Sequence, residues 1–333
     1  MSLQDMKAES SLNTVCYNND IEDSVMITEP LFRQLNLPVT SENENHQTDF
    51  EMEELYYDGL ENLAGSNLAF KLRHEESLEN STNSNTSFSW VPSNSSSLVG
   101  NHEFPWSARI SFSNSPGKFY CDGVLINKRY ILTTGRCLEP QRNIDKIRLG
   151  DHNCLPSENC HQNDYVDVDI EKVILHPGYG VEDGLTKDNI ALIRLNKDIK
   201  STDNISPVCL PKLNEIAKAG DKVIEIGWSM ANSTYNKKLK TEATISDQLK
   251  CFKTYEQNFG VKLTNFHLCS EGYPEDRCAS STGDSLVRLR QPGKQWLLEG
   301  INYFGPTGCS KDIPIVFTRV EPYLRWIHQT IKN

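Results

Sequence analysis

The sequence predicts an all-β fold for residues 98–333, and three observations support this prediction. Short runs of β-branched and aromatic residues recur between turn residues, at the regular spacing typical of β-sandwiches and barrels. Nine of the ten cysteines are dispersed through this part, as expected for disulfides. Only the C-terminal residues have a helical pattern, with Pro322 in the first turn and one apolar face made by Tyr323, Trp326, Ile327 and Ile331.

The expected strands are eight segments with β-like composition, bounded by turn residues. The terminal helix is expected to pack its apolar face against them. The eight segments are Ala108–Phe112, Phe119–Ile126, Tyr130–Thr134, Val168–Leu175, Ile190–Leu195, Lys222–Trp228, Trp296–Tyr303 and Ile315–Val320.

The first 97 residues are expected to lie outside this β body. Residues 1–98 carry 17 acidic and 4 basic side chains, a net charge of −13, whereas the whole chain carries −11. Residues 1–79 are weakly patterned, with one expected helix at Met52–Leu63, and residues 80–97 form a Ser/Asn-rich linker. Such a composition buries too little apolar surface to offset its ordering entropy. We therefore expect a mostly disordered acidic extension followed by a flexible linker.

Composition also excludes several functions. The body has no basic stripe, which argues against nucleic acid as a partner, and no apolar run is long enough to span a membrane. No Cys-x-x-Cys pair is present, so we expect no metal, and we expect no cofactor.

The cysteines indicate an oxidising, extracellular compartment, although the first residues contain no signal peptide. Five Asn-x-Ser/Thr sequons agree with secretion and glycosylation. They are Asn80, Asn85, Asn94, Asn204 and Asn232.

Several segments in collinear order make the body resemble the trypsin/chymotrypsin family of serine proteases. The resemblance implies two six-stranded antiparallel β-barrels with a C-terminal helix, and a catalytic site in the cleft between the barrels. These segments are Phe104–Trp106, Tyr130–Cys137, His176–Tyr179, Asp188–Ile193, Pro207–Pro211, Gly227–Trp228, Gly300–Cys309 and Phe317–Ile327.

Residues 148–151, followed by Cys154 and Cys160, resemble the arthropod clip-protease branch of this family. The clip module itself needs several cysteines upstream. Only Cys16 lies there, so no clip domain is expected.

These proteases use a serine nucleophile, a histidine base and an aspartate that orients the histidine. By this resemblance Arg136 stands at the histidine position, directly before Cys137. A guanidinium keeps its proton at physiological pH and cannot act as a base. The aspartate is expected to survive as Asp188, in a fixed ion pair with Arg136. The alternative for Asp188 is a turn carboxylate without a catalytic part.

The nucleophile loop departs from the family pattern in the same way. Aligned without gaps, Thr282 stands at the nucleophile position, Ser281 at the preceding aspartate and Ser280 at the oxyanion-hole glycine. The triplet Gly283-Asp284-Ser285 offers Ser285 as an alternative nucleophile, but only if residues are inserted and then deleted. On that alternative the protein is an active secreted serine endopeptidase.

Activation and substrate recognition also look degenerate. Family zymogens are cut after Arg or Lys to free an Ile-Val-Gly-Gly terminus, whereas the corresponding Leu98–Asn101 here follows serines. Large side chains are expected where a substrate side chain should enter. The predicted pocket residues are Asp276 at the base and Arg277, Tyr303, Phe304, Gly305 and Ile315 on the walls.

The resemblance implies five disulfides, Cys121–Cys137, Cys251–Cys269, Cys278–Cys309, Cys154–Cys160 of the clip branch, and Cys16–Cys209. The sequence therefore predicts a secreted, non-catalytic serine protease homologue that binds a protein, either an active protease or its substrate, in an extracellular cascade. The alternatives are the Ser285 endopeptidase and a purely structural or decaying gene product.

Overall fold

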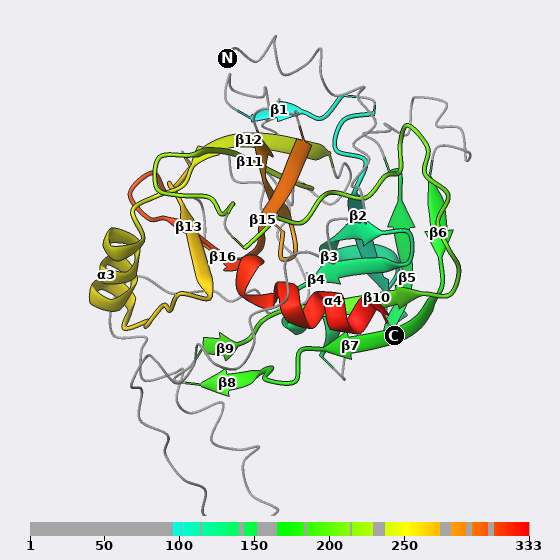
Figure 1. Ribbon diagram of the computed structural model, residues 1–333, viewed down its shortest axis with the longest axis horizontal. Helices are drawn as coiled ribbons and strands as arrows, with labels where there is room; N and C mark the ends of the chain where they lie inside the picture. The colour runs from blue at the N-terminus through cyan, green and yellow to red at the C-terminus, as the bar shows by residue number, and fades with distance from the viewer. Residues whose placement is uncertain are drawn as a thin grey trace, which may run out of the picture. The chain divides into compact units, whose positions relative to one another are not determined.

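The computed structural model describes residues 96–332 except for residues 101, 114, 140–142, 152–164, 183–184, 214, 229–236, 274–280, 291–294 and 306–309. Two curled antiparallel sheets and short helices make up this part of the chain (Figure 1). The predicted extension, its helix at Met52–Leu63 and the linker up to residue 95 lie outside the described residues.

The first sheet is closed by one bent strand. Its order is β6-β5-β2-β3-β4-β10-β7, and only Asp169 separates β6 from β7 along the chain. β6 pairs with β5 at one edge, while β7 pairs with β10 at the other. Six strands, one of them bent, therefore form a barrel. The bounds are β2 Ser107–Phe112, β3 Ser115–Asn127, β4 Tyr130–Thr133, β5 Ile144–Leu149, β6 Val166–Val168, β7 Ile170–Leu175 and β10 Ala191–Leu195.

The second sheet has the order β1-β12-β11-β14-β15-β16-β13. Just past β12, Ile245 pairs with Ser270 at the end of β13, and this bridge closes six of the strands into a second barrel. β1 is added outside this closure. The bounds are β1 Ser96–Leu98, β11 Lys222–Trp228, β12 Lys238–Thr244, β13 His267–Ser270, β14 Ser285–Arg290, β15 Gln295–Phe304 and β16 Ile315–Arg319.

The predicted chymotrypsin-like architecture and all eight predicted strands are confirmed, with boundaries shifted by a few residues. One part of the linker behaves differently from the prediction. Ser96 and Ser97, assigned to a flexible segment, pair with Thr241 and Lys240 of β12. Backbone pairing needs no particular side chain, so a serine-rich sequence can supply an edge strand.

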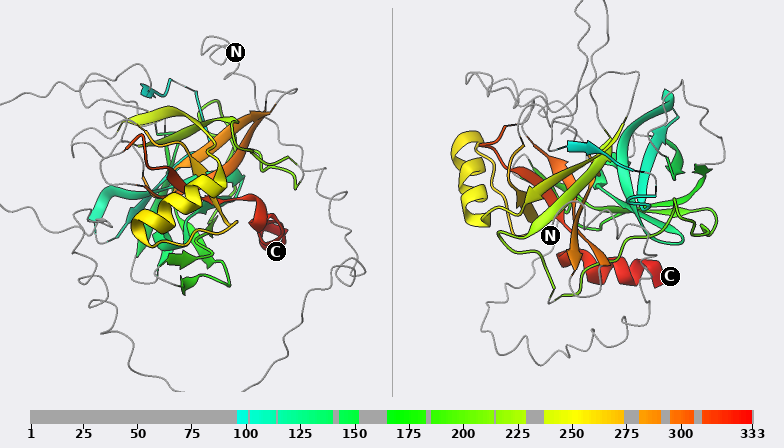
Figure 2. Two further views of the ribbon diagram at one scale, coloured as in Figure 1. Left: turned by 90° about the vertical axis from the view of Figure 1, so that its left-hand side faces the viewer. Right: turned by 90° about the horizontal axis from the view of Figure 1, so that it is seen from above.

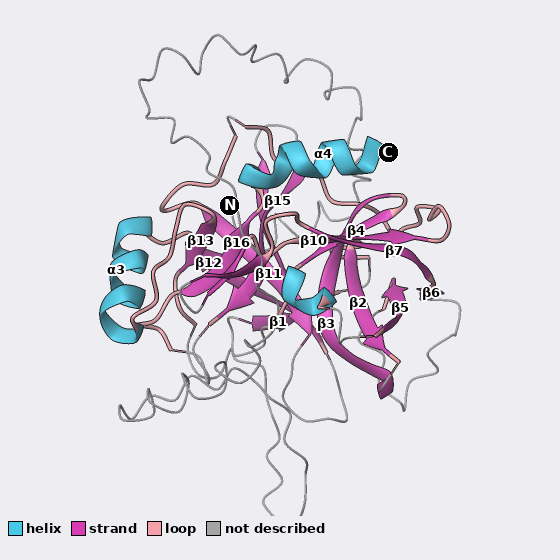
Figure 3. Ribbon diagram, turned by 90° about the horizontal axis from the view of Figure 1, so that it is seen from below, coloured by secondary structure: helices cyan, strands magenta, loops and turns pink. Residues whose placement is uncertain are grey.

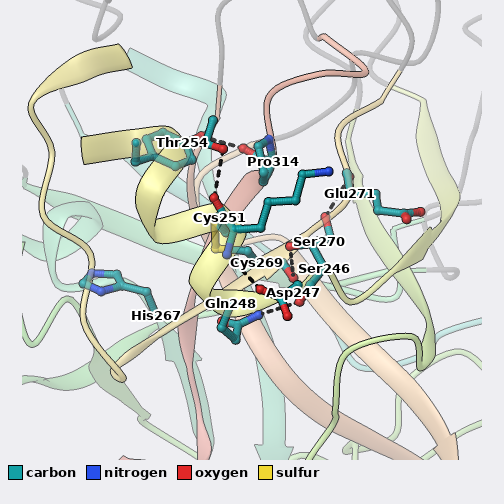
Figure 4. Close-up of a disulfide and its surroundings, with 12 residues drawn as sticks. Ser246, Asp247, Gln248, Cys251, Thr254, His267, Cys269, Ser270, Glu271 and Pro314 are labelled. Carbon is teal, nitrogen blue, oxygen red and sulfur yellow. Dashed lines mark hydrogen bonds between the residues drawn. A yellow bond between two sulfur atoms is a disulfide. The ribbon is translucent and has the colours of Figure 1, made fainter. Parts of the chain in front are cut away.

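The helix α3, Gln248–Phe259, was not predicted from the sequence. The Asp247 side chain caps its first turn by accepting a hydrogen bond from the backbone N–H of Lys250, at 2.8 Å. Gly260 ends it with a left-handed φ of 68°. The Cys251–Cys269 disulfide fastens it to β13 (Figure 4).

The terminal helix is confirmed as a 3-10 turn, Glu321–Tyr323, followed by α4, Leu324–Lys332. Tyr323 and Ile327 are buried in a core cluster to which strands of both barrels contribute, and Trp326 and Ile331 pack against it. The views in Figures 2 and 3 place α4 and α3 on different sides of the sheets. Within the described residues, no helix is long and apolar enough to cross a membrane.

Two of the five predicted disulfides, Cys121–Cys137 and Cys251–Cys269, are confirmed. Cys209 is also disulfide-bonded. Its predicted partner Cys16, and the pairs Cys154–Cys160 and Cys278–Cys309, lie outside the described residues. Of the predicted sequons, Asn204 is described and is half-buried, while Asn80, Asn85, Asn94 and Asn232 lie outside.

Candidate active site

Arg136 is held in place by the elements around it. It lies on a short 3-10 helix, Gly135–Leu138, that follows β4, and the adjacent Cys137 is fastened to β3 through Cys121. The helix begins against the ring of Tyr179, because a Cβ at Gly135 would lie 2.3 Å from that ring. The backbone at this position is therefore fixed, and the half-buried guanidinium is carried on it.

The expected ion pair between Arg136 and Asp188 is wrong. The Asp188 carboxylate accepts a hydrogen bond from the Tyr323 hydroxyl at 2.9 Å and lies 3.8 Å from His176 Nδ1. Within the described residues, no ion pair joins Asp188 to Arg136. Asp188 lies in a turn with a left-handed φ of 46°, and its carboxylate lies against Tyr323 and His176.

The side chain that faces the Arg136 turn belongs to Asn189. Its Oδ1 accepts a hydrogen bond from the backbone N–H of Arg136 at 2.9 Å, and its own carbonyl accepts one from the Thr318 hydroxyl at 3.0 Å. Asn189 is 2% exposed. Asn189 was not predicted as a site residue, because Asp188 beside it offered the carboxylate that the resemblance implies. A neutral amide thus occupies the position that can orient residue 136.

Thr282 lies at the same disulfide as Arg136. Its backbone carbonyl accepts a hydrogen bond from Asp122 N at 2.9 Å and lies 3.8 Å from Cys137 Sγ. Gly283 follows with a φ of 99°, and a Cβ there would lie 1.9 Å from the Asp122 carbonyl oxygen. Only glycine fits both restrictions. The structure therefore brings together Arg136, Asn189 and the backbone of Thr282.

Ser285, the alternative nucleophile, lies in a different setting. It begins β14, where it pairs with Ile226 and Ile301 in the neighbouring strands, and it is 3% exposed. A serine nucleophile needs access to its substrate and an adjacent base. Among the described residues, no base is hydrogen-bonded to the Ser285 hydroxyl.

Two acidic residues, Asp122 and Asp284, are buried under the Thr282 loop. The Asp284 carboxylate accepts a hydrogen bond from Ser281 N at 2.6 Å, which ties the two ends of the loop together. A Cβ at Gly227 would lie 1.8 Å from this carboxylate, so glycine leaves it room. Burial raises the pKa of Asp284 well above its usual range, and the neighbouring Asp122 raises it further. Burial also raises the pKa of Asp122, so the pair favours a shared proton.

The predicted pocket walls are filled by protein side chains. Tyr303 is 5% exposed; its hydroxyl accepts a hydrogen bond from Thr186 N at 2.8 Å and donates one to Thr186 O at 3.4 Å. This links β15 to the hairpin formed by β8, Gly180–Glu182, and β9, Leu185–Lys187. A Cβ at Gly305 would lie 2.8 Å from Ile315 Cδ1, and the Phe304 ring packs on Tyr303 at 4.6 Å. Asp276, Arg277 and Ser280 lie outside the described residues.

Two of the described histidines, His176 and His267, have contacts other than Thr282. His176 contacts Asp188 and the rings of Tyr323 and Trp326 instead. His267 is buried against Tyr303, and burial lowers its pKa to about 4. In the part of the chain that the structure describes, no group of three His, Cys, Asp or Glu residues could hold a metal ion.

Comparisons with known proteins agree with this architecture. The sequence pattern of the Trypsin family matches residues 96–327. The chain is similar to the CLIP domain-containing serine protease B4 of Anopheles gambiae, with 36% identity over 69% of this chain and 67% of that protein. It is also similar to phenoloxidase-activating factor 1 of Holotrichia diomphalia, with 35% identity over 69% and 67%. Melanization protease 1 of Drosophila melanogaster is 32% identical over 69% and 63%. The chain therefore belongs to the trypsin family of chymotrypsin-like serine proteases.

Proposed function

We propose that this protein is a non-catalytic member of the trypsin family that acts by binding another protein in an extracellular protease cascade. The observation that carries the proposal is the pairing of Arg136 with Asn189 where a protease needs a base and its orienting carboxylate. The relatives are named as CLIP-domain proteases, as a phenoloxidase-activating factor and as a melanization protease.

Replacing members of a catalytic triad is known to lower kcat by several orders of magnitude. Replacing the orienting aspartate by asparagine in a working triad lowers kcat by about 10⁴, because the base is held in the wrong tautomer. Removing the base or the nucleophile lowers kcat by about 10⁶, and such losses do not add. Here Arg136, Asn189 and Thr282 replace all three groups. Restoring any one of them leaves the remaining defects in place.

Two features support binding rather than cutting. The backbone of the site is ordered by the Cys121–Cys137 disulfide and by the Thr282 carbonyl contact, although its reactive groups are absent. Tyr303 and Ile315, which the sequence places on the wall of the substrate pocket, are buried, and this supports a closed pocket. An ordered fold with a filled pocket can still offer its outer surface to a partner. The disulfides and the relatives fit an extracellular site of action.

A labelled fluorophosphonate separates this proposal from an active enzyme, because it reacts only with an activated nucleophile. We expect no labelling of the purified protein under conditions that label trypsin fully, and no hydrolysis of Arg, Phe or Ala peptide substrates. Labelling at Thr282 or Ser285 would disprove the proposal. Affinity capture from body fluid of the producing organism should then recover a cascade protease or its substrate. Failure to capture either would favour a structural or decaying gene product.

A further inference from the structure

The chain passes from β1 on the second sheet to β2 of the first barrel through a strained corner. His102 has a φ of 64° and Phe104 a φ of 52°, values that side-chain-bearing residues rarely adopt. Such conformations persist only where the surrounding structure enforces them. The Phe104 ring is buried between Trp106 and Trp296, each 5.5 Å away and edge to face. Aromatic packing fixes one side of the corner, and the contacts of Glu103 fix the other.

Glu103 connects the corner to β12 through a buried ion pair. Its two carboxylate oxygens lie 2.7 and 2.5 Å from Lys240 Nζ, and the side chains are 11% and 8% exposed. The same carboxylate accepts a hydrogen bond from Gly100 N at 2.7 Å. Glu103 therefore fixes the backbone three residues before it as well as its own position. A charge buried so deeply is stable only while its partner is present.

The Lys238 side chain binds the backbone carbonyls of the same corner. Its Nζ donates a hydrogen bond to the Phe104 carbonyl at 2.8 Å and another to the Glu103 carbonyl at 3.4 Å. The ammonium also lies 5.6 Å from the centre of the Trp228 ring. Lys238 and Lys240 are two residues apart on β12, so their side chains share one face of the strand.

The backbone of β12 holds the segment that precedes the corner. Ser97 pairs with Lys240 and Leu98 with Leu239, and Val99 N donates to the Lys238 carbonyl at 3.0 Å. The same short stretch of β12 thus contacts residues 96–99 through its backbone, and Glu103 and Phe104 through the side chains of Lys238 and Lys240.

We propose that Glu103, Lys238 and Lys240 form a latch that fixes residues 96–104 on the second barrel while the chain is uncut. With the latch in place, the second barrel holds this segment without a cleavage that would free Leu98. We therefore expect the segment to resist cleavage between residues 96 and 104. This inference goes beyond the proposed function, because it concerns maturation and holds whether or not the protein cuts peptides.

The test uses the full-length chain and the Glu-specific endoproteinase Glu-C, which reads Glu103 directly. Lys240→Met is compared with Lys222→Met, which removes an exposed lysine that bonds to Thr244 in the same barrel. We expect Lys240→Met to be cut after Glu103 at least about tenfold faster than the control, because cleavage follows the population of the open segment. Mass spectrometry identifies the new terminus at Phe104.

A second variant guards against general unfolding. Glu103→Gln keeps the shape of the side chain but weakens the ion pair, and chymotrypsin then reports opening by cutting after Leu98, since Pro105 blocks cleavage after Phe104. We expect faster cutting at Leu98 while the rest of the body stays intact. Cleavage of Lys240→Met no faster than Lys222→Met would overturn the latch. So would native protein that carries a new terminus between residues 96 and 104.

Discussion

Two clusters of ionisable side chains are buried in this protein, one that pairs an acid with a base and one that pairs two acids. The latch joins Glu103 to Lys240, an acid and a base, at 2.5–2.7 Å. The second cluster, under the Thr282 loop, joins the two acids Asp122 and Asp284, and burial raises the pKa of both. Opposite charges stabilise each other's ionised forms, whereas like charges favour protonation of one member. Removing one member of the Glu103–Lys240 pair is therefore expected to destabilise the protein, whereas removing one charge of the Asp122–Asp284 pair is expected to stabilise it.

The largest effect is expected from Glu103→Ala, which leaves the Lys240 ammonium buried without its partner. We expect a loss of about 3–5 kcal/mol in the free energy of unfolding, since breaking a buried ion pair exposes the full desolvation cost of the remaining charge. Urea unfolding followed by tryptophan fluorescence measures it. The matched control is Glu171→Ala, which removes an exposed carboxylate paired with Arg129 and is expected to change stability by less than about 1 kcal/mol. Equal losses of unfolding free energy in both variants would show that the buried Glu103–Lys240 pair stabilises the protein no more than an exposed pair does.

A smaller effect of the opposite sign is expected from Asp284→Asn. Because the folded pKa of Asp284 lies above its unfolded value, the wild-type protein should lose stability as pH rises from about 4 towards that folded pKa. The neutral amide removes this dependence and keeps an oxygen for Ser281 N. We expect the variant to be more stable by about 1–2 kcal/mol at pH 8 and equal or less stable at pH 4.

Unfolding midpoints between pH 4 and pH 8 test this prediction. The exposed Asp203 provides the control, since Asp203→Asn should leave the curve unchanged. A curve for Asp284→Asn that runs parallel to the wild type would contradict the shared-proton account of the two acids.

The smallest expected effect is on peptidase activity. Arg136→His returns a base, yet its orienting group is the neutral Asn189 and the hydroxyl it must activate belongs to Thr282. We expect no turnover above the unmodified protein on Arg, Phe or Ala peptide substrates. Asn189→Asp added to Arg136→His should change little, because Tyr303 and Ile315 still fill the pocket. Clear hydrolysis by either variant would show that the losses are not in series.

Much of the barrel frame could be predicted from local sequence patterns. Strands such as Lys222–Trp228 and the apolar face of the terminal helix are periodic features that neighbouring residues determine. β12 escaped prediction because it reads Lys238-Leu-Lys-Thr-Glu, the composition of an exposed segment. Its lysines are buried only because Glu103, far away in sequence, folds over them. No local pattern contains that information.

The candidate site combines residues that the sequence predicted with residues that it did not. Arg136 and Tyr303 could be named as site residues because a disulfide and a motif fix the alignment nearby, and their roles in a site stay predictions. The distinction between Asp188 and Asn189 could not be made from composition, since both are polar and adjacent. The left-handed turn at Asp188 decides which of the two side chains faces the Arg136 turn, and composition does not reveal that turn. The acids at Asp122 and Asp284 were missed because their contact depends on the fold.

Gly283 is a position at which this sequence tolerates no substitution, for reasons of backbone geometry. Side chains at positions 136, 189 and 282 can be exchanged between related genes once no substrate depends on them. Glycine at 283 cannot, because its φ of 99° and the 1.9 Å approach of the Asp122 carbonyl exclude every larger residue. Selection for a folded chain alone preserves it. Orthologues should therefore vary most where the family is chemically active and least at this bend of the backbone, so that conservation here records architecture and not catalysis.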